Sequence, residues 1–484
     1  MKSGMSGWGS APASGIVVLS LGDMSVEGKK VNIKFIFVTM LLSSIISGFV
    51  AASMGTAIPA IMEEFAVSAG MAQWLTSLYS LAAGILTIAT AFIIKRFPTK
   101  RVFFMGIGLF TVGVLACVFS SNFMLLIVGR ILQGVGSGIL ISMTQVVILT
   151  LFPQEKRGFM MGFYGLAVGF TPVFGPVIAG ILIDHGGWRM LFVIALVMCI
   201  ADIVMGLICM RNVLETVVAG FDIGSMALAG IGFTGITLAL GNMGAHPFLS
   251  PQVGLALLIG IAGLAVFVLR QLKLDDPLLE MRTFKTRDFA VAVFLCMAVN
   301  ALMNGTAAVM TIFVQTIQGG TATQFGLILM PFALIVGLLS PVVGKWYDKA
   351  GMRPIALFGG TTILVSAIGL LFLNESTPGW FIMILFIVMG LGVPGFMTQS
   401  ITWGMDRLSD AWTADGTAII NCLRTIGNAL GTAVFVALMS GTSSSGAELT
   451  AADARVSFIG MFGLAVALFI VSVFLVRKPK KAVG

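Results

Sequence analysis

Three charged side chains lie inside long apolar stretches or at their ends, where charge is costly. Arg130 and Asp202 each fall within an apolar stretch, and Asp184 ends another beside His185. Ionisable residues in such stretches are rare and commonly functional, and an acid removed from water can exchange a proton near neutral pH. We therefore treat Arg130, Asp202 and Asp184 as candidates for proton coupling. Each has a structural alternative: an arginine that snorkels to the interface, an acid that bonds two helices together, and a solvated loop acid.

Small residues surround the first two charges at helical spacing. Residues three and four apart are neighbours on a helix, so Arg130 shares one predicted face with Gly134, Ser137 and Gly138. Asp202 shares another with Ala195, Cys199 and Gly206. Small side chains let a second helix approach closely. Arg130 is therefore predicted to face the interior of a helix bundle.

Glycine and proline form a second pattern, within residues 159–183. Its members are Gly162, Gly165, Gly169, Pro172, Gly175, Pro176 and Gly180. At ~100° per residue on a helix, all but Gly175 fall within a narrow arc. Proline inside a span is tolerated where neighbouring helices satisfy the freed backbone groups. The stripe predicts a close helix contact that can slide or hinge.

A third pattern lies in the polar segment that follows the apolar stretch near residues 324–344. It consists of Gly344, Asp348, Gly351 and Arg353, with lysines between them. Glycine, acid and base at this spacing in a tight turn suit a charge-relay latch between helix ends. An ordinary solvated loop is the alternative.

Membrane-spanning helices must position these residues. Of the 484 residues, 58% are apolar and 10% are charged, against ~25% charged in soluble domains. A span needs ~20 apolar residues, and about fourteen stretches are long enough. We predict an all-α membrane protein with spans near residues 33–60, 71–94, 102–121, 123–151, 159–183, 190–210, 223–243, 252–270, 289–315, 324–344, 354–374, 379–403, 416–439 and 457–476.

Basic residues predict the orientation of these spans. Lysine and arginine gather in alternate loops, whereas the intervening loops hold only Arg189 and Arg455. Short basic loops stay in the cytoplasm, so both termini are predicted to lie there. The net charge of +8 is then an orientation signal and calls for no nucleic-acid partner. Five cysteines, all in apolar stretches, argue against a disulfide framework.

The sequence offers little support for enzyme chemistry. It contains no G-x-x-x-x-G-K-[ST] loop for ATP, and a G-x-G-x-x-G that begins at Gly390 lies inside an apolar stretch where helix packing explains it. The two histidines, His185 and His246, form no metal-ligand cluster with other residues, and no metal site is predicted. Transport by the spans themselves is the leading interpretation.

Together the three patterns resemble those of the major facilitator superfamily. Its fourth-span motif is matched by Arg130, Gln133 and Gly134. The fifth-span motif of its antiporters is matched by residues 169–180, and its second-half loop motif by residues 344–353. The added pair of spans near 223–243 and 252–270 resembles the fourteen-span drug:proton antiporter branch.

The resemblance implies two six-helix bundles that flank a two-helix insertion, with both termini in the cytoplasm. The corresponding divisions are a disordered cytoplasmic leader (1–32), an N-terminal bundle (33–211), the insertion with its linkers (212–287), a C-terminal bundle (288–476) and a basic tail (477–484).

The resemblance also implies a function. The expected protein is a secondary transporter of the bacterial cytoplasmic membrane that exports small amphipathic or cationic compounds in exchange for protons, by alternating access. It would use the proton gradient and no cofactor, and its partners would be the substrate and the lipid bilayer. Alternatives are a narrow exporter of one metabolite or anionic compound, and a non-transporting sensor. Candidates for the cavity between the bundles are Gln145, Asn300, Asn304, Gln315, Gln399, Asn421 and Arg424, and Arg424 is also a gating candidate because it is predicted to lie near a cytoplasmic helix end.

The sequence departs from the family where proton-binding acids are expected. Val50 stands where the first span usually has an acid, and Lys95 replaces the acid of the first-half loop motif. The thirteenth predicted span, residues 416–439, contains no acid. Asp202 is therefore the one deeply placed carboxylate.

Overall fold

A computed structural model describes residues 17–20, 23–26, 29–67, 69–214, 216, 222–242, 250–274, 277–320, 322–440 and 450–476. Within these ranges, 13 helices are long and apolar enough to cross a membrane, and a shorter apolar helix covers Ile223–Ala239. The prediction of a helical membrane protein is confirmed at this level.

The N-terminal half contains six helices. They are α1 (Ile33–Phe65), α2 (Ala69–Arg96), α3 (Thr99–Val118), α4 (Phe123–Leu151), α5 (Gln154–Gly186) and α6 (Arg189–Cys209). Two further helices follow, α7 (Ile223–Asn242) and α8 (Pro251–Lys273), and then a short 3-10 turn, η1 (Met281–Lys285).

The C-terminal half begins with α9 (Arg287–Ile312), which continues into a π-helical turn, η2 (Phe313–Ile317). It continues with α10 (Ala322–Ala350) and α11 (Met352–Leu370). One span is then built from α12 (Gly379–Pro394), the π-turn η3 (Gly395–Gln399) and α13 (Ser400–Met405). The half ends with a 3-10 turn, η4 (Asp410–Trp412), followed by α14 (Thr413–Ser440) and α15 (Ala451–Phe474).

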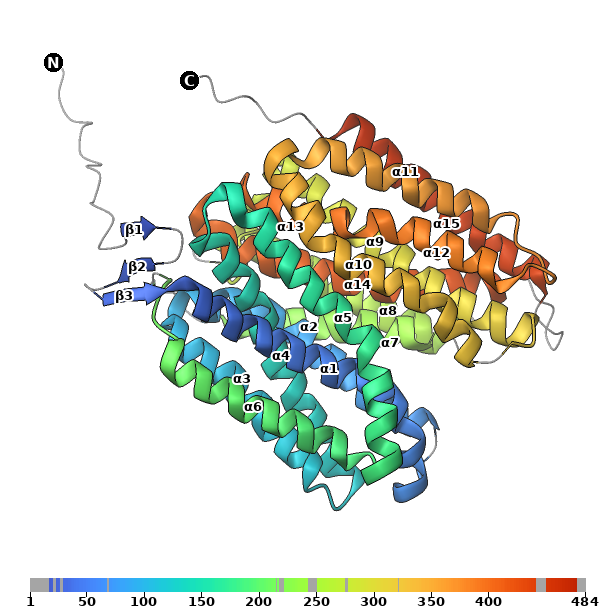
Figure 1. Ribbon diagram of the computed structural model, residues 1–484, viewed down its shortest axis with the longest axis horizontal. Coiled ribbons are helices and arrows are strands. Elements are labelled where there is room, and N and C mark those ends of the chain that lie inside the picture. Colours follow the sequence, from blue (N-terminus) through green and yellow to red (C-terminus); the bar gives the residue numbers. More distant parts are fainter. Residues whose placement is uncertain are drawn as a thin grey trace.

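The two halves lie side by side, with the beginning of α1 and the end of α15 toward the same end of the molecule (Figure 1). They meet along two seams, because α5 packs on α10 and α2 packs on α14. Helix α7 contacts both α2 and α14, and α8 packs on α7. The inserted pair therefore covers the seam between α2 and α14.

Several helices extend beyond the predicted spans. Helix α5 begins at Gln154, α14 begins at Thr413, and α10 continues through Lys349 to Ala350. Hydropathy marks only the apolar centre of a helix, whereas backbone hydrogen bonds continue into the polar turns. Asp348 therefore lies in a helix and not in the predicted turn, and the break comes at Gly351, whose φ of 74° is left-handed.

The segment expected to be a disordered leader contains strands in its described part. These are β1 (Val17–Ser20), β2 (Asp23–Val26) and β3 (Lys29–Asn32), which pair in the antiparallel order β1-β2-β3. Asp23 lies opposite Asn32, and Val26 lies opposite Lys29. The expectation of disorder is wrong for these strands, because valines at four of their positions favour extended backbone. Residues 1–16 lie outside the described residues.

Candidate functional site

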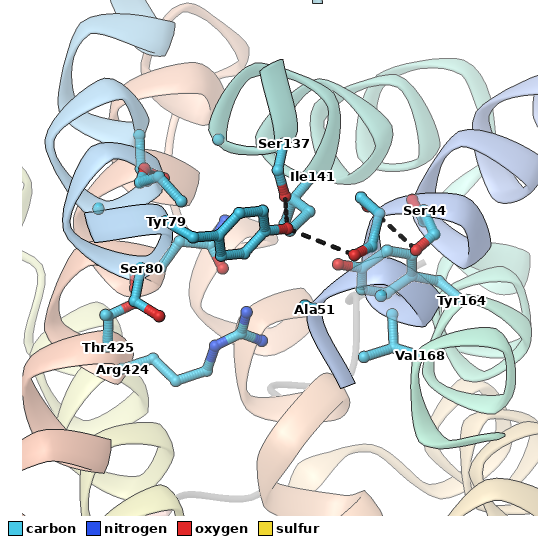
Figure 2. A pocket seen from close by; sticks show the side chains of 17 residues that line it. Ser44, Ala51, Tyr79, Ser80, Ser137, Ile141, Tyr164, Val168, Arg424 and Thr425 are labelled. Carbon is cyan, nitrogen blue, oxygen red and sulfur yellow. Dashed lines mark hydrogen bonds between the residues drawn. The ribbon is translucent and has the colours of Figure 1, made fainter. Parts of the chain in front are cut away.

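A cavity of about 210 Å³ lies between the halves, where α1, α2, α4 and α5 face α14 (Figure 2). Its wall is partly apolar, with Ala51, Ile141 and Val168, and partly polar, with Ser80, Tyr164 and Thr425. Among the described residues that line it, Arg424 is the one charged side chain, and no aspartate or glutamate is present. A ligand in this cavity would therefore meet a single positive charge.

Tyr79 forms the wall of the cavity on the α2 side. Its hydroxyl donates to Ser137 Oγ at 2.9 Å and lies 3.3 Å from the Ser47 carbonyl oxygen (Figure 2). The guanidinium of Arg130 lies 4.3 Å from the centroid of the Tyr79 ring. Tyr79 lines the cavity and Arg130 does not, and the Tyr79 hydroxyl links α2 to α1 and α4.

Arg130 is fully buried, with 0% of its side chain exposed. Its Nε donates to the Leu75 carbonyl oxygen at 3.0 Å, and one terminal nitrogen donates to Gln133 Oε1 at 2.7 Å. Gln133 Nε2 in turn lies 3.3 Å from Cys117 Sγ. This geometry rules out snorkelling. The prediction that Arg130 and Gly134 share one helix face is also confirmed. Arg130 bonds to Leu75 of α2, and a Cβ on Gly134 would lie 2.4 Å from the Tyr79 carbonyl oxygen of the same helix.

Side chains from the two halves meet at the cavity. Asn421 Nδ2 of α14 donates to Gln145 Oε1 of α4 at 2.7 Å. Tyr164 of α5 and Arg424 of α14 both line the cavity, one from each half. Arg424 lies in the middle of α14, and its placement near a helix end is therefore wrong, because that helix begins at Thr413 and ends at Ser440.

The other polar candidates lie away from this cavity. Asn304 Nδ2 donates to Asn428 Oδ1 at 2.8 Å within the C-terminal half, and Asn300 Nδ2 donates to a carbonyl of its own helix. Gln315 lies in the π-turn η2, outside the cavity wall. Gln399 is buried beside α5, 3.4 Å from the Gly158 carbonyl oxygen. Of the seven predicted cavity residues, Asn421 and Arg424 line it.

Asp202 and Asp184 have contrasting environments. Asp202 is fully buried in α6, with its face of small residues turned inward. The Ser43 hydroxyl of α1 contacts its Oδ2 at 2.5 Å, and its Oδ1 has no hydrogen-bond partner among the described residues. Asp184 is exposed at the end of α5. Neither carboxylate lines the cavity.

We call the end of the molecule that carries Lys34, Lys95, Lys156, Lys345 and Lys349 the basic end. There Lys95 of α2 forms an ion pair with Asp415 in the first turn of α14. The Asp415 side chain is fully buried, whereas that of Lys95 is 28% exposed. The expectation that the span predicted at residues 416–439 contains no acid is therefore wrong. Helix α14 begins at Thr413, before that apolar stretch, and so includes Asp415.

Asp348 and Asp406 join the halves at the same end. Asp348 of α10 accepts from the backbone N–H groups of Gly158 and Phe159 at 2.8 and 2.9 Å, at the beginning of α5. Asp406, which follows α13, binds Arg157 at 3.0 Å and accepts from the Tyr347 hydroxyl at 2.9 Å. Burial raises the pKa of Asp406, and the contacts with Tyr347 and Arg157 oppose that rise.

The glycine stripe of α5 shows where the halves touch. A Cβ on Gly162 would lie 2.4 Å from the Ser340 carbonyl oxygen, and one on Gly169 would lie 3.1 Å from Gly337 Cα, both in α10. Gly175, the member outside the predicted arc, faces Ala52 of α1 instead. At Gly180 a Cβ would meet nothing within 4 Å. The contact between α5 and α10 is therefore tight toward the basic end and absent at Gly180.

Sequence reasoning missed the tyrosines and Asp415. The chain has three tyrosines. Tyr79 and Tyr164 line the cavity, and Tyr347 binds Asp406 between the halves. A tyrosine hydroxyl inside an apolar stretch needs a hydrogen-bond partner. The small number of tyrosines and their positions in or beside apolar stretches could therefore have indicated polar contacts between helices.

The ion pair between Lys95 and Asp415 gives a first prediction. Lys95→Asp places a second carboxylate against buried Asp415, and breaking a buried pair costs about 3–5 kcal/mol. We expect the basic end to open and transport to fall at least tenfold. The double variant Lys95→Asp/Asp415→Lys restores the pair and most of the transport. The readout is uptake into inverted vesicles, with Arg96→Asp, at the exposed neighbouring position, as the control. A double variant no better than Lys95→Asp would contradict a latch.

Comparison with known proteins identifies similar chains. Residues 40–432 match the family description Major Facilitator Superfamily. The uncharacterized MFS-type transporter YcnB of Bacillus subtilis is 33% identical over 94% of this chain and 98% of its own. The lincomycin resistance protein LmrB of Bacillus subtilis is 32% identical over 84% of this chain and 85% of its own.

Among solved structures, the proton:xylose symporter XylE superposes with a TM-score of 0.64. The sequences are 14% identical, and the match covers 92% of this chain and 96% of that one. At this identity the likeness shows a shared fold.

Proposed function

Because the chain belongs to the Major Facilitator Superfamily, we propose that this transporter exports small amphipathic compounds in exchange for protons. The observation that carries the proposal is the cavity between the halves. Helices α5 and α10 pack tightly toward the basic end, whereas a Cβ at Gly180 of α5 would meet nothing within 4 Å. A transporter that alternates access needs one central site and seals that can form on either side of it. The resistance function in the name of LmrB supports export.

We further propose fourteen spans, with the basic end in the cytoplasm. The basic loops support this orientation. The fourteenth span would be α7, whose apolar part covers Ile223–Ala239 and is shorter than the other 13. In this orientation the structure is sealed toward the cytoplasm by three links: Lys95 to Asp415, Asp348 to the beginning of α5, and Arg157 to Asp406. Export would require these links to break and a seal to form near Gly180.

Asp202 is the carboxylate we propose as proton carrier. Ser43 Oγ lies 2.5 Å from Asp202 Oδ2 and 3.2 Å from the Thr39 carbonyl oxygen. A neutral acid can donate to Ser43 while Ser43 donates to Thr39. Oδ1 has no hydrogen-bond partner among the described residues in either state, and burying it that way costs more for an anionic acid than for a neutral one. Protonation of Asp202 would therefore change the contact between α1 and α6.

The test is substrate uptake into inverted vesicles with an imposed pH gradient. For wild type we expect uptake that stops when an ionophore collapses the gradient. Asp202→Asn mimics the neutral acid, and we expect it to lose gradient-driven uptake while retaining exchange of substrate between the two sides. Asp184→Asn, at an exposed acid, serves as the matched control. Gradient-driven uptake that survives Asp202→Asn would exclude Asp202 as the carrier, and uptake insensitive to the ionophore would exclude proton coupling.

A second candidate, a narrow exporter of an anionic compound, is favoured by Arg424. A polyspecific exporter of cations would be expected to place a negative charge in its cavity, and none is present among the described lining residues.

A further inference from the structure

We infer that the substrate is a small organic monoanion whose carboxylate binds Arg424. The inference rests on the proposed function only in taking the central cavity as the substrate site. It follows from the charge of the cavity, the hydrogen-bond donors around it and its size.

The positive charge at the cavity has no partner acid among the described residues. Arg424 is the one charged side chain in its wall. Behind Tyr79, buried Arg130 adds a second positive charge, and its partners are a carbonyl, an amide oxygen and an aromatic ring. Removing a charge from water is costly unless an opposite charge compensates it. An anion in the cavity would provide that compensation, and a cation would increase the cost.

The donors beside Arg424 suit a carboxylate. Figure 2 shows the guanidinium extending into the space between Tyr79 and Tyr164. A guanidinium presents a planar fork of N–H groups that binds the two oxygens of a carboxylate together. Ser80 also lines the cavity, whereas the Thr425 hydroxyl already donates to the Asn421 carbonyl oxygen at 3.0 Å. One guanidinium in the wall matches one negative charge on the ligand.

The rest of the wall limits the body of the ligand. Ala51, Ile141 and Val168 offer an apolar surface to a ring or a short chain. The volume of about 210 Å³ lies below the ~300–1,000 Å³ typical of pockets for drug-sized ligands. A compact aromatic or aliphatic acid fits these limits.

The charge of the substrate has an energetic consequence. An anion that leaves the cell and a proton that enters both move positive charge inward. A membrane potential that is negative inside would therefore drive both movements, whereas it would oppose the exit of a cation. Export of a monoanion in exchange for one proton moves two charges per cycle.

The test compares small carboxylates with their neutral amides. Purified protein in lipid nanodiscs is titrated with salicylate and salicylamide, and with three further acid–amide pairs of similar size, and binding is followed by calorimetry. We expect at least one carboxylate to bind at least tenfold more tightly than its amide. Arg424→Gln should abolish that preference, Arg424→Lys should retain part of it, and Arg455→Gln, at an exposed position of α15, should leave it unchanged.

The outcomes separate this inference from the proposed function. No carboxylate preference in any pair, or an equal preference in Arg424→Gln protein with a wild-type unfolding temperature, would overturn the inference. Preference for a carboxylate without proton-driven transport of it would overturn the proposed coupling and leave the site assignment intact. Proton-driven efflux of a cationic dye, unaffected by Arg424→Gln, would overturn the inference and leave the proposed function intact.

Discussion

Gly162→Val is expected to abolish transport while the protein remains folded. A Cβ at this position would lie 2.4 Å from the Ser340 carbonyl oxygen and 2.7 Å from Pro341 Cα. Both are backbone atoms of α10, so they cannot rotate away as a side chain would. Helices α5 and α10 would have to separate where the two halves meet. Overpacking of this kind costs about 1–3 kcal/mol, which shifts a two-state equilibrium by roughly fivefold to more than a hundredfold.

Two measurements check this result. Uptake into inverted vesicles should fall at least tenfold. In a background with the five cysteines replaced by alanine, Thr398→Cys should react faster with a membrane-impermeant maleimide supplied at the basic end. Thr398 is a suitable reporter because it is buried beside Gly165, with its Cγ2 2.8 Å from the position of a Cβ there.

Gly180→Val is the matched control for Gly162→Val. It lies in the same helix and belongs to the same stripe, but a Cβ there meets nothing within 4 Å. We expect Gly180→Val to retain most of the transport that Gly162→Val loses. Full transport by Gly162→Val would show that the contact between α5 and α10 does not control access.

Arg130→Met is expected to lose transport and to keep or gain stability. Arg130 is fully buried and pairs with no acid among the described residues. A charge buried without an opposite partner carries a large desolvation cost, and an apolar residue of similar volume removes that cost. The substitution also removes the cation that lies 4.3 Å from the Tyr79 ring. Tyr79 would then lose one of the contacts that hold it in the wall of the cavity, and would keep those with Ser137 and Ser47.

The measurements are the unfolding temperature in detergent and uptake into vesicles. We expect an unfolding temperature at or above that of wild type, with transport reduced more than tenfold. Arg130→Lys keeps the charge but loses the planar fork that reaches both Leu75 and Gln133, so partial transport is expected. A Met variant that fails to fold would show that Arg130 serves the structure, and a folded Met variant that transports normally would remove Arg130 from the mechanism.

The sequence by itself determined the helices and their contact faces. Helix α4 begins and ends at the predicted residues, because a bilayer requires an apolar stretch of fixed length and the periodicity within it is local. The face of Arg130 and the exclusion of Gly175 from the α5 stripe are also confirmed. Both follow from the rotation of ~100° per residue, which involves no other part of the chain.

Only the tertiary structure decided which residues act together. The pairing of Lys95 with Asp415 joins helices far apart in the sequence, and the polar end of α14 that carries Asp415 lies outside the apolar stretch. Likewise, Asn421 meets Gln145 and Arg424 faces the cavity, while Asn304 and Gln399 do not line it. Polarity at membrane depth predicts that a side chain needs a partner. The packing of one half against the other determines which partner it finds and whether that place is a cavity, a seal or a helix contact.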